Sequence, residues 1–143
     1  ELRAVLQKLA RTEGEKGQPE TSNLPELVDW LGLLQQDGLN PYVRDVLGLI
    51  AAHYRERLSV EQTADALGIS ASYLSRKLKE NTGHTFNSLV TRYRLQQSLA
   101  LLREGRLRVY EVAEQVGFSD YKNFAQVFRK YLAMTPSQFM QGL

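Results

Sequence analysis

Apolar residues recur along most of this 143-residue chain at the three- and four-residue spacing of an amphipathic helix, and no segment alternates with the two-residue period of a strand. Two stretches, Ser59 to Gln62 and Thr135 to Gln138, have the form of capping boxes at helix starts. The pattern predicts an all-α fold. The expected helices after residue 22 cover about 23–37, 40–57, 60–67, 70–81, 85–103, 109–116, 120–131 and 136–141.

The sequence contains the same helix-turn-helix unit twice. VEQTADALGIS aligns with VYEVAEQVGFS, and the helices that follow align after one residue is inserted behind the second turn. In each unit a small residue stands four positions before a glycine, Ala64 before Gly68 and Ala113 before Gly117. The small residue lets two helices pack closely, and the glycine permits the positive φ of a tight turn. We therefore expect two helix-turn-helix subdomains joined by the long helix 85–103.

The second helix of each unit has an exposed face without a carboxylate. At 100° per residue, Leu74 and Leu78 define the buried side of helix 70–81, and the opposite side carries Ser72, Arg76 and Lys79. The same projection of helix 120–131 buries Phe124 and Phe128 and exposes Lys122, Gln126 and Arg129. A single such face is usually only the solvated side of a helix, but its repetition at equivalent positions favours a polyanionic partner.

Helices of this type enter the major groove of DNA, where Arg pairs with guanine and Gln with adenine. Arg76 and Gln126 are accordingly the leading candidates for base reading. Helix 85–103 spans roughly 28 Å at about 1.5 Å per residue, close to the ~34 Å between successive major-groove faces on one side of a duplex. One chain is thus long enough to read two adjacent groove segments.

The charge distribution agrees with this interpretation. Residues 1–40 carry 4 Lys and Arg against 7 Asp and Glu, whereas residues 41–143 carry 14 against 9. The net charge of +2 therefore conceals a basic body behind an acidic N-terminal part.

Several function classes are disfavoured by composition. Cysteine is absent, His53 and His84 are the only histidines, and no glycine-rich phosphate loop occurs, so we expect neither an enzyme nor a metal or cofactor site. No apolar run is long enough to cross a membrane, and we expect a cytoplasmic protein. The remaining alternative to DNA binding is a helical protein-interaction module.

From residue 42 to about residue 141 the chain resembles the DNA-binding domain of the AraC-type transcriptional regulators. The resemblance is carried by ADALGIS, YLSRKLK and TGHTF in the first unit, RLQQSLALL in the connecting helix, and VAEQVGFSD, FAQVFRK and MTPSQF in the second unit. It implies a seven-helix domain whose third and sixth helices read consecutive major grooves of an operator in double-stranded DNA.

The resemblance also implies a set of contact residues, which agrees with the helical projection except at Ser75 and Tyr121. The base-contacting positions are Ser72, Ser75, Arg76, Tyr121, Lys122 and Gln126. For phosphate contacts we expect Lys79, His84, Thr85, Asn123, Arg129 and Lys130.

Five residues depart from the usual pattern of that family. Lys122, Asn123 and Gln126 replace its commoner residues on the second reading helix, so its base preference does not carry over to this chain. Ser98 stands where Ala is usual and Ala133 where Gly is usual, and we expect these two to alter only packing and a turn.

Residues 1–10, ELRAVLQKLA, resemble the end of the last helix of a response-regulator receiver domain, although an effector domain or a plain linker helix would give a similar pattern. We expect a linker with a short helix over 11–39, a first subdomain over 40–84 and a second over 104–143. The expected partners besides DNA are a second copy of the chain, joined through the N-terminal region, and RNA polymerase if the protein is an activator.

Overall fold

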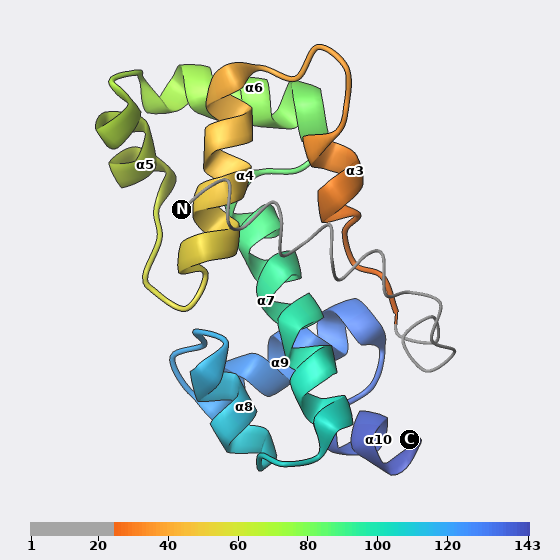
Figure 1. The fold of residues 1–143 in the computed structure, drawn as a ribbon. Coiled ribbons are helices and arrows are strands. Elements are labelled where there is room, and N and C mark those ends of the chain that lie inside the picture. Colours follow the sequence, from red (N-terminus) through yellow and green to blue (C-terminus); the bar gives the residue numbers. More distant parts are fainter. Residues whose placement is uncertain (1–24) are drawn as a thin grey trace.

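The computed structural model describes residues 25–143, which form eight helices and no strand, and so confirms the all-α prediction (Figure 1). The expected segment 1–10 and the start of the linker lie outside the described residues. The helices are α3 (Trp30–Leu34), α4 (Pro41–His53), α5 (Val60–Leu67), α6 (Ala71–Thr82), α7 (Phe86–Glu104), α8 (Val109–Gln115), α9 (Tyr121–Leu132) and α10 (Pro136–Gln141).

Side-chain oxygens placed just before most helices accept hydrogen bonds from the otherwise unpaired first backbone N–H groups. Ser70 Oγ accepts from Tyr73 N at 3.0 Å at the start of α6. The capping box predicted at Thr135 is complete, because Gln138 Oε1 also accepts from Thr135 N at 2.9 Å. At Ser59 only half of the predicted box forms, the bond from Gln62 N to Ser59 Oγ at 3.1 Å.

The apolar faces form two hydrophobic cores, one for each helix-turn-helix unit. The first lies between α3, α4, α5, α6 and the N-terminal half of α7 and contains Trp30, Leu47, Ile50, Leu74, Leu78 and Leu89. The second lies between the C-terminal half of α7, α8 and α9 and contains Leu95, Leu99, Leu102, Val116, Phe124 and Phe128. A single long helix thus contributes one half of its length to each core.

Two predicted helices are shorter in the structure because side chains of α7 bind their backbone. The helix expected over 40–57 ends at His53, and Arg94 donates from Nε to Tyr54 O and from Nη2 to Glu56 O, each at 2.7 Å. Of the helix expected over 23–37, the structure describes residues 25–37, and within them only Trp30–Leu34 is helical.

The described residues before α3 instead run along α7. Gln96 Nε2 donates to Pro25 O at 3.0 Å, and Leu27 N donates to Gln96 Oε1 at 2.8 Å. Arg92 Nη1 donates to Leu27 O at 3.0 Å. Gln96 and Arg92 of α7 thus bind backbone groups of Pro25 and Leu27. In a longer α3 these groups would instead have formed hydrogen bonds within the helix.

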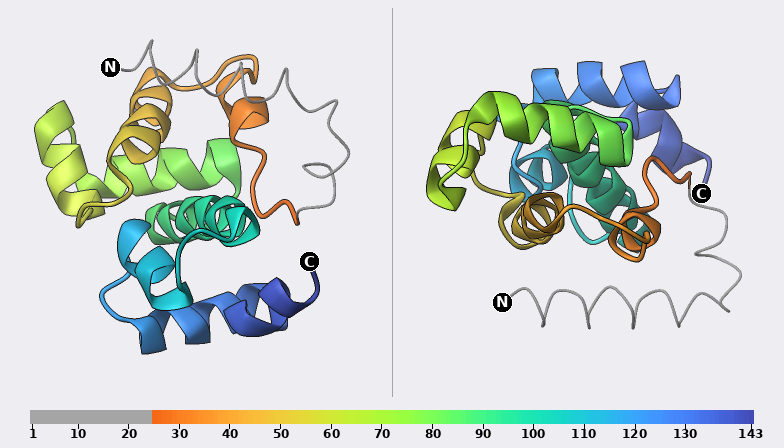
Figure 2. Two further views of the ribbon diagram at one scale, coloured as in Figure 1. Left: turned by 60° about the horizontal axis from the view of Figure 1, so that its bottom comes forward. Right: turned by 90° about the horizontal axis from the view of Figure 1, so that it is seen from above.

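The two second helices, α6 and α9, run along the same side of the molecule. The right-hand view of Figure 2 shows them together along one side, with α3 and α4 on the opposite side. Their solvent-facing surfaces are therefore available together to one extended partner.

Candidate nucleic-acid interface

Helix α6 presents its polar face because its apolar face is anchored in the first core. Leu74 and Leu78 are fully buried, as predicted. On the other side Ser72, Ser75 and Arg76 are exposed to solvent. The geometry therefore leaves these three side chains free to meet a partner that approaches α6. Glu80, one helical turn after Arg76, is exposed as well, so the prediction that this face of α6 lacks a carboxylate is wrong.

Arg76 stands over an aromatic ring instead of pairing with an acid. Its Cζ lies 5.5 Å from the ring centroid of Tyr73, three residues earlier on the helix. Lys77 Nζ lies 5.7 Å from the same ring, but it also forms an ion pair with Glu80 at 3.1 Å. Within residues 25–143, Arg76 takes part in no ion pair and its side chain donates no hydrogen bond to protein.

Helix α9 is positioned by a row of aromatic rings. Phe124 and Phe128 are fully buried, their centroids are 5.5 Å apart, and Phe118 and Phe139 extend the row at 5.1 and 6.1 Å. The opposite face exposes six of the predicted contact residues, namely Tyr121, Lys122, Asn123, Gln126, Arg129 and Lys130.

One carboxylate stands at the start of α9. Asp120 Oδ1 accepts a hydrogen bond from Asn123 N at 2.7 Å and so caps the helix. The predicted acid-free face of Lys122, Gln126 and Arg129 lies within the helix and does not include this residue. A negative charge at a helix N-terminus stabilises the helix, which accounts for Asp120 without a role at the surface.

Three predicted phosphate contacts lie around the turn from α6 to α7. Lys79 Nζ donates to Gly83 O at 3.2 Å, and Thr85 Oγ1 accepts from Ser88 N at 3.1 Å. His84 is half-buried between them, whereas the other eleven predicted contact residues are exposed. Burial, and then the charges of Arg92 and Lys79, lower the pKa of His84 below its ordinary value.

The shifts at Tyr93 and Arg94 belong to the interior of the domain. Burial, followed by the neighbouring Tyr54, raises the pKa of Tyr93 to about 12. Burial also lowers the pKa of the Arg94 guanidinium, which is bound to two backbone oxygens. Only the His84 shift therefore concerns the candidate interface.

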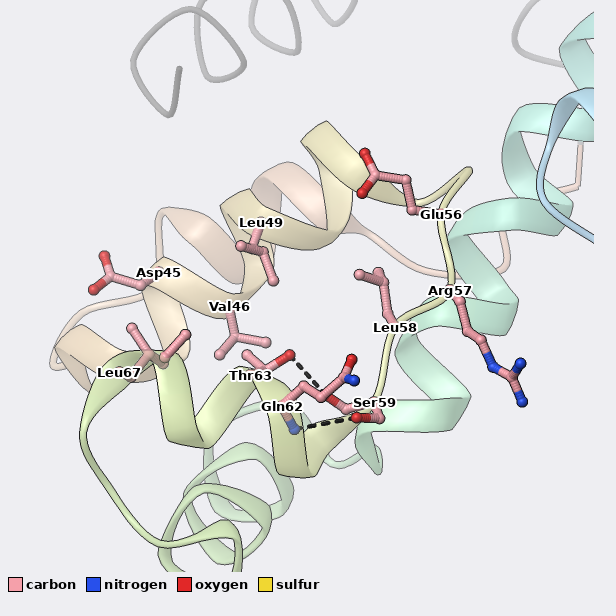
Figure 3. Close-up of a pocket in the computed structure, with 11 residues that line it drawn as sticks. Asp45, Val46, Leu49, Glu56, Arg57, Leu58, Ser59, Gln62, Thr63 and Leu67 are labelled. Carbon is pink, nitrogen blue, oxygen red and sulfur yellow. Dashed lines mark hydrogen bonds between the residues drawn. The ribbon is translucent and has the colours of Figure 1, made fainter.

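A groove of about 360 Å³ lies elsewhere, between α4 and α5 (Figure 3). Its lining includes Leu49, Leu58 and Leu67 together with the carboxylates of Asp45 and Glu56, and none of the twelve predicted contact residues. The two carboxylates outnumber the one basic lining residue, Arg57, so the groove is a poor site for a polyanion. The candidate interface therefore consists of the exposed faces of α6 and α9 and does not include this groove.

Within residues 25–143, no group of three or more His, Asp or Glu side chains is arranged to hold a metal ion. None of the described helices has the length and apolar character needed to span a bilayer.

The contact between Tyr73 and Asn40 was not predicted from the sequence. Tyr73 OH accepts a hydrogen bond from Asn40 Nδ2 at 3.3 Å. An aromatic residue three positions before an arginine on a helix could have indicated the ring contact, because side chains at that spacing are neighbours. Asn40 followed by Pro41 predicts a helix cap, which the structure confirms, but no local pattern indicates its bond to Tyr73, 33 residues away.

The family model of a helix-turn-helix domain matches residues 63–142. An uncharacterized response regulatory protein of Staphylococcus epidermidis is 40% identical over 107 residues, which cover 75% of this chain and 42% of that protein. The transcriptional regulatory protein HptR of Staphylococcus aureus is 34% identical over 140 residues, which cover 97% of this chain and 55% of HptR. The chain therefore spans about half the length of the curated relatives it matches.

A solved structure has the same fold. The C-terminal domain of AraT, a response regulator from Geobacillus stearothermophilus, matches with a TM-score of 0.72 and 31% sequence identity. The match covers 75% of this chain and 89% of that one.

Proposed function

Because this chain belongs to the AraC-type helix-turn-helix family of DNA-binding transcription regulators, we propose that it reads two successive major-groove segments of one duplex with α6 and α9. The observation that carries the proposal is that α6 and α9 lie on the same side of the molecule and that each exposes basic and polar side chains to solvent. The 19 residues of α7 make a helix roughly 28 Å long, close to the ~34 Å between successive major-groove faces on one side of a duplex. The family is a class of regulators and not of enzymes.

In this proposal Arg76 and Gln126 read bases, because their planar side chains can form paired hydrogen bonds to guanine and to adenine. Their neighbours Ser72, Ser75, Tyr121 and Lys122 reach adjacent base edges. The phosphate contacts are made by Lys79, His84, Thr85, Asn123, Arg129 and Lys130. Such contacts position a protein on DNA without selecting a sequence.

We also propose that the output of this domain is controlled by an upstream domain in the cytoplasm. Two curated relatives are named a response regulatory protein and a transcriptional regulatory protein, and each is longer than this chain. A phosphorylated receiver domain would alter pairing of two copies or exposure of the reading helices. Recruitment of RNA polymerase would follow if the protein activates transcription.

The affinity for duplex DNA at several salt concentrations tests the proposal. Each neutralised phosphate contributes about −0.9 to the slope of log affinity against log salt, so six contacts predict a slope near −5. Selection from a random duplex pool should then yield a site with two preferred segments about one helical turn apart. A flat salt response would instead favour a protein-interaction module.

A further inference from the structure

The side chain that supports Arg76 is itself held from outside the reading helix. Tyr73 is half-buried at the flank of α6, and its ring lies 5.5 Å from Arg76 Cζ. The Tyr42 ring meets it edge-on at 6.2 Å between centroids. Tyr73 OH accepts from Asn40 Nδ2 at 3.3 Å. The ring is thus held on its hydroxyl end and on one side by residues at the start of α4.

Asn40 is fixed in turn by bonds that join α4 to the end of α6. Its Oδ1 caps α4 by accepting from Tyr42 N at 2.8 Å and from Val43 N at 3.3 Å. Its backbone N–H donates to Asn81 Oδ1 at 2.9 Å, and Gln36 Nε2 donates to Asn81 O at 3.0 Å. The side-chain amide of Asn40 therefore forms hydrogen bonds through both of its polar atoms: Oδ1 caps α4, and Nδ2 donates to Tyr73 OH.

We infer that Tyr73, held by Asn40, is a positioning residue that orients Arg76 for base reading. This inference rests on the proposed function of Arg76. A contact with the ring restricts the long arginine side chain but consumes none of its N–H donors, which stay available for a base. A side chain already restricted loses less conformational freedom when it binds.

Lys77, the other cation near the Tyr73 ring, differs from Arg76 because it is paired with an acid. Lys77 contacts the same ring, but Glu80 matches its charge at 3.1 Å. Arg76 has no such partner within residues 25–143, and its guanidinium lies 5.5 Å from the centre of the Tyr73 ring. Discrimination at the base pair read by Arg76 therefore depends on a residue outside α6, at the junction of α4 with the preceding connector.

Tyr73→Phe, Tyr73→Leu, Asn40→Ser and Arg76→Ala test the inference in the 143-residue chain. For each variant, affinity is measured for the selected duplex and for a duplex changed at the base pair whose preference Arg76→Ala relaxes. We expect Tyr73→Leu to lower this discrimination about three- to ten-fold, because the ring contact is lost. Tyr73→Phe and Asn40→Ser should cause smaller losses, because the ring remains without its anchor. The salt slope should stay unchanged, since no phosphate contact is removed.

Arg76→Ala combined with Tyr73→Leu provides the decisive comparison. If Tyr73 acts through Arg76, Tyr73→Leu causes no further loss of discrimination once Arg76 is absent. Equal weakening on both duplexes would overturn the inference and leave the proposed function intact. A wild-type chain that binds duplex DNA without salt dependence would instead overturn the proposed function. Tyr73→Phe and Asn40→Ser retain the ring and a helix-capping residue, and thermal melting followed by circular dichroism identifies any effect that comes from unfolding.

Discussion

A side-chain carbon on Gly117 would lie 2.8 Å from the backbone oxygen of Tyr54. The turn of the second unit therefore presses directly on the segment that follows α4 in the first unit. Gly117 also has a φ of 98°, which side-chain-bearing residues rarely adopt. Arg94 binds the same Tyr54 oxygen at 2.7 Å, so one carbonyl group lies where the two helix-turn-helix units meet.

Gly117→Ala should destabilise the domain more than Gly68→Ala, its counterpart in the first unit. Gly68 has a φ of 74° and open space around it, so its replacement costs only about 1 to 2 kcal/mol of backbone strain. At Gly117 the close contact is added, and we expect a total of about 2 to 4 kcal/mol. Chemical denaturation of both variants measures the difference. Equal losses of unfolding free energy in the two variants would show that the close contact between residue 117 and the Tyr54 oxygen adds no destabilisation.

Ala133→Gly should stabilise the domain by about 0.5 to 1 kcal/mol. Ala133 ends α9 with a φ of 61°, and it is the one non-glycine residue with positive φ within residues 25–143. The equivalent position after α6 is Gly83, with a φ of 78°. Gly83→Ala is the matched control and should lose stability. An Ala133→Gly protein that melts at a lower temperature than the wild type would contradict this account.

The lowered pKa of His84 predicts how stability depends on pH. In the free protein the neutral imidazole is favoured, because His84 is half-buried near Arg92 and Lys79. Below its ordinary value of 6.5 the unfolded chain takes up a proton that the folded chain does not. The contribution of neutral His84 to the free energy of unfolding is therefore complete above pH 6.5. It decreases as the pH falls from 6.5 toward the lowered pKa of the folded protein. Denaturation of the wild type and His84→Gln between pH 5 and 8 isolates it.

DNA binding should reverse the effect at the same residue. A phosphate beside His84 would favour the imidazolium, so affinity should rise as the pH falls through the region of 6.5 and protons should be taken up on binding. Affinity measured for the wild type and His84→Gln across this range tests the contact. Identical pH profiles would remove His84 from the interface.

Arg76→Ala and Arg129→Ala should separate base reading from phosphate anchoring. Both side chains are exposed, one on α6 and one on α9. Arg76→Ala should relax the preference at one base pair by about 1 to 3 kcal/mol, whereas Arg129→Ala should weaken all duplexes similarly and reduce the salt slope by about one. Site selection and salt titration of both variants distinguish the outcomes. Matching behaviour would refute the assignment of the two roles.

Local sequence features predicted most helices and the exposed sides of α6 and α9. Helical periodicity predicted that Leu74 and Leu78 are buried, which the structure confirms. The capping residues Ser70 and Thr85 stand directly before α6 and α7. These features depend on neighbours within one or two turns, so a short stretch of sequence contains the information. The contact roles of the exposed residues stay predictions.

What the sequence by itself determined is the all-α architecture, the duplicated unit and the exposure of Arg76 and Gln126, because each follows from helical spacing and capping within a few residues. Only the tertiary structure decided where α4 ends, how Asn40 reaches the ring beside Arg76 and why Gly117 must approach Tyr54. The physical reason is that these contacts join residues that are far apart in the sequence and come together only when the helices pack. Partners separated by 33 to 63 residues along the chain leave no local periodic pattern.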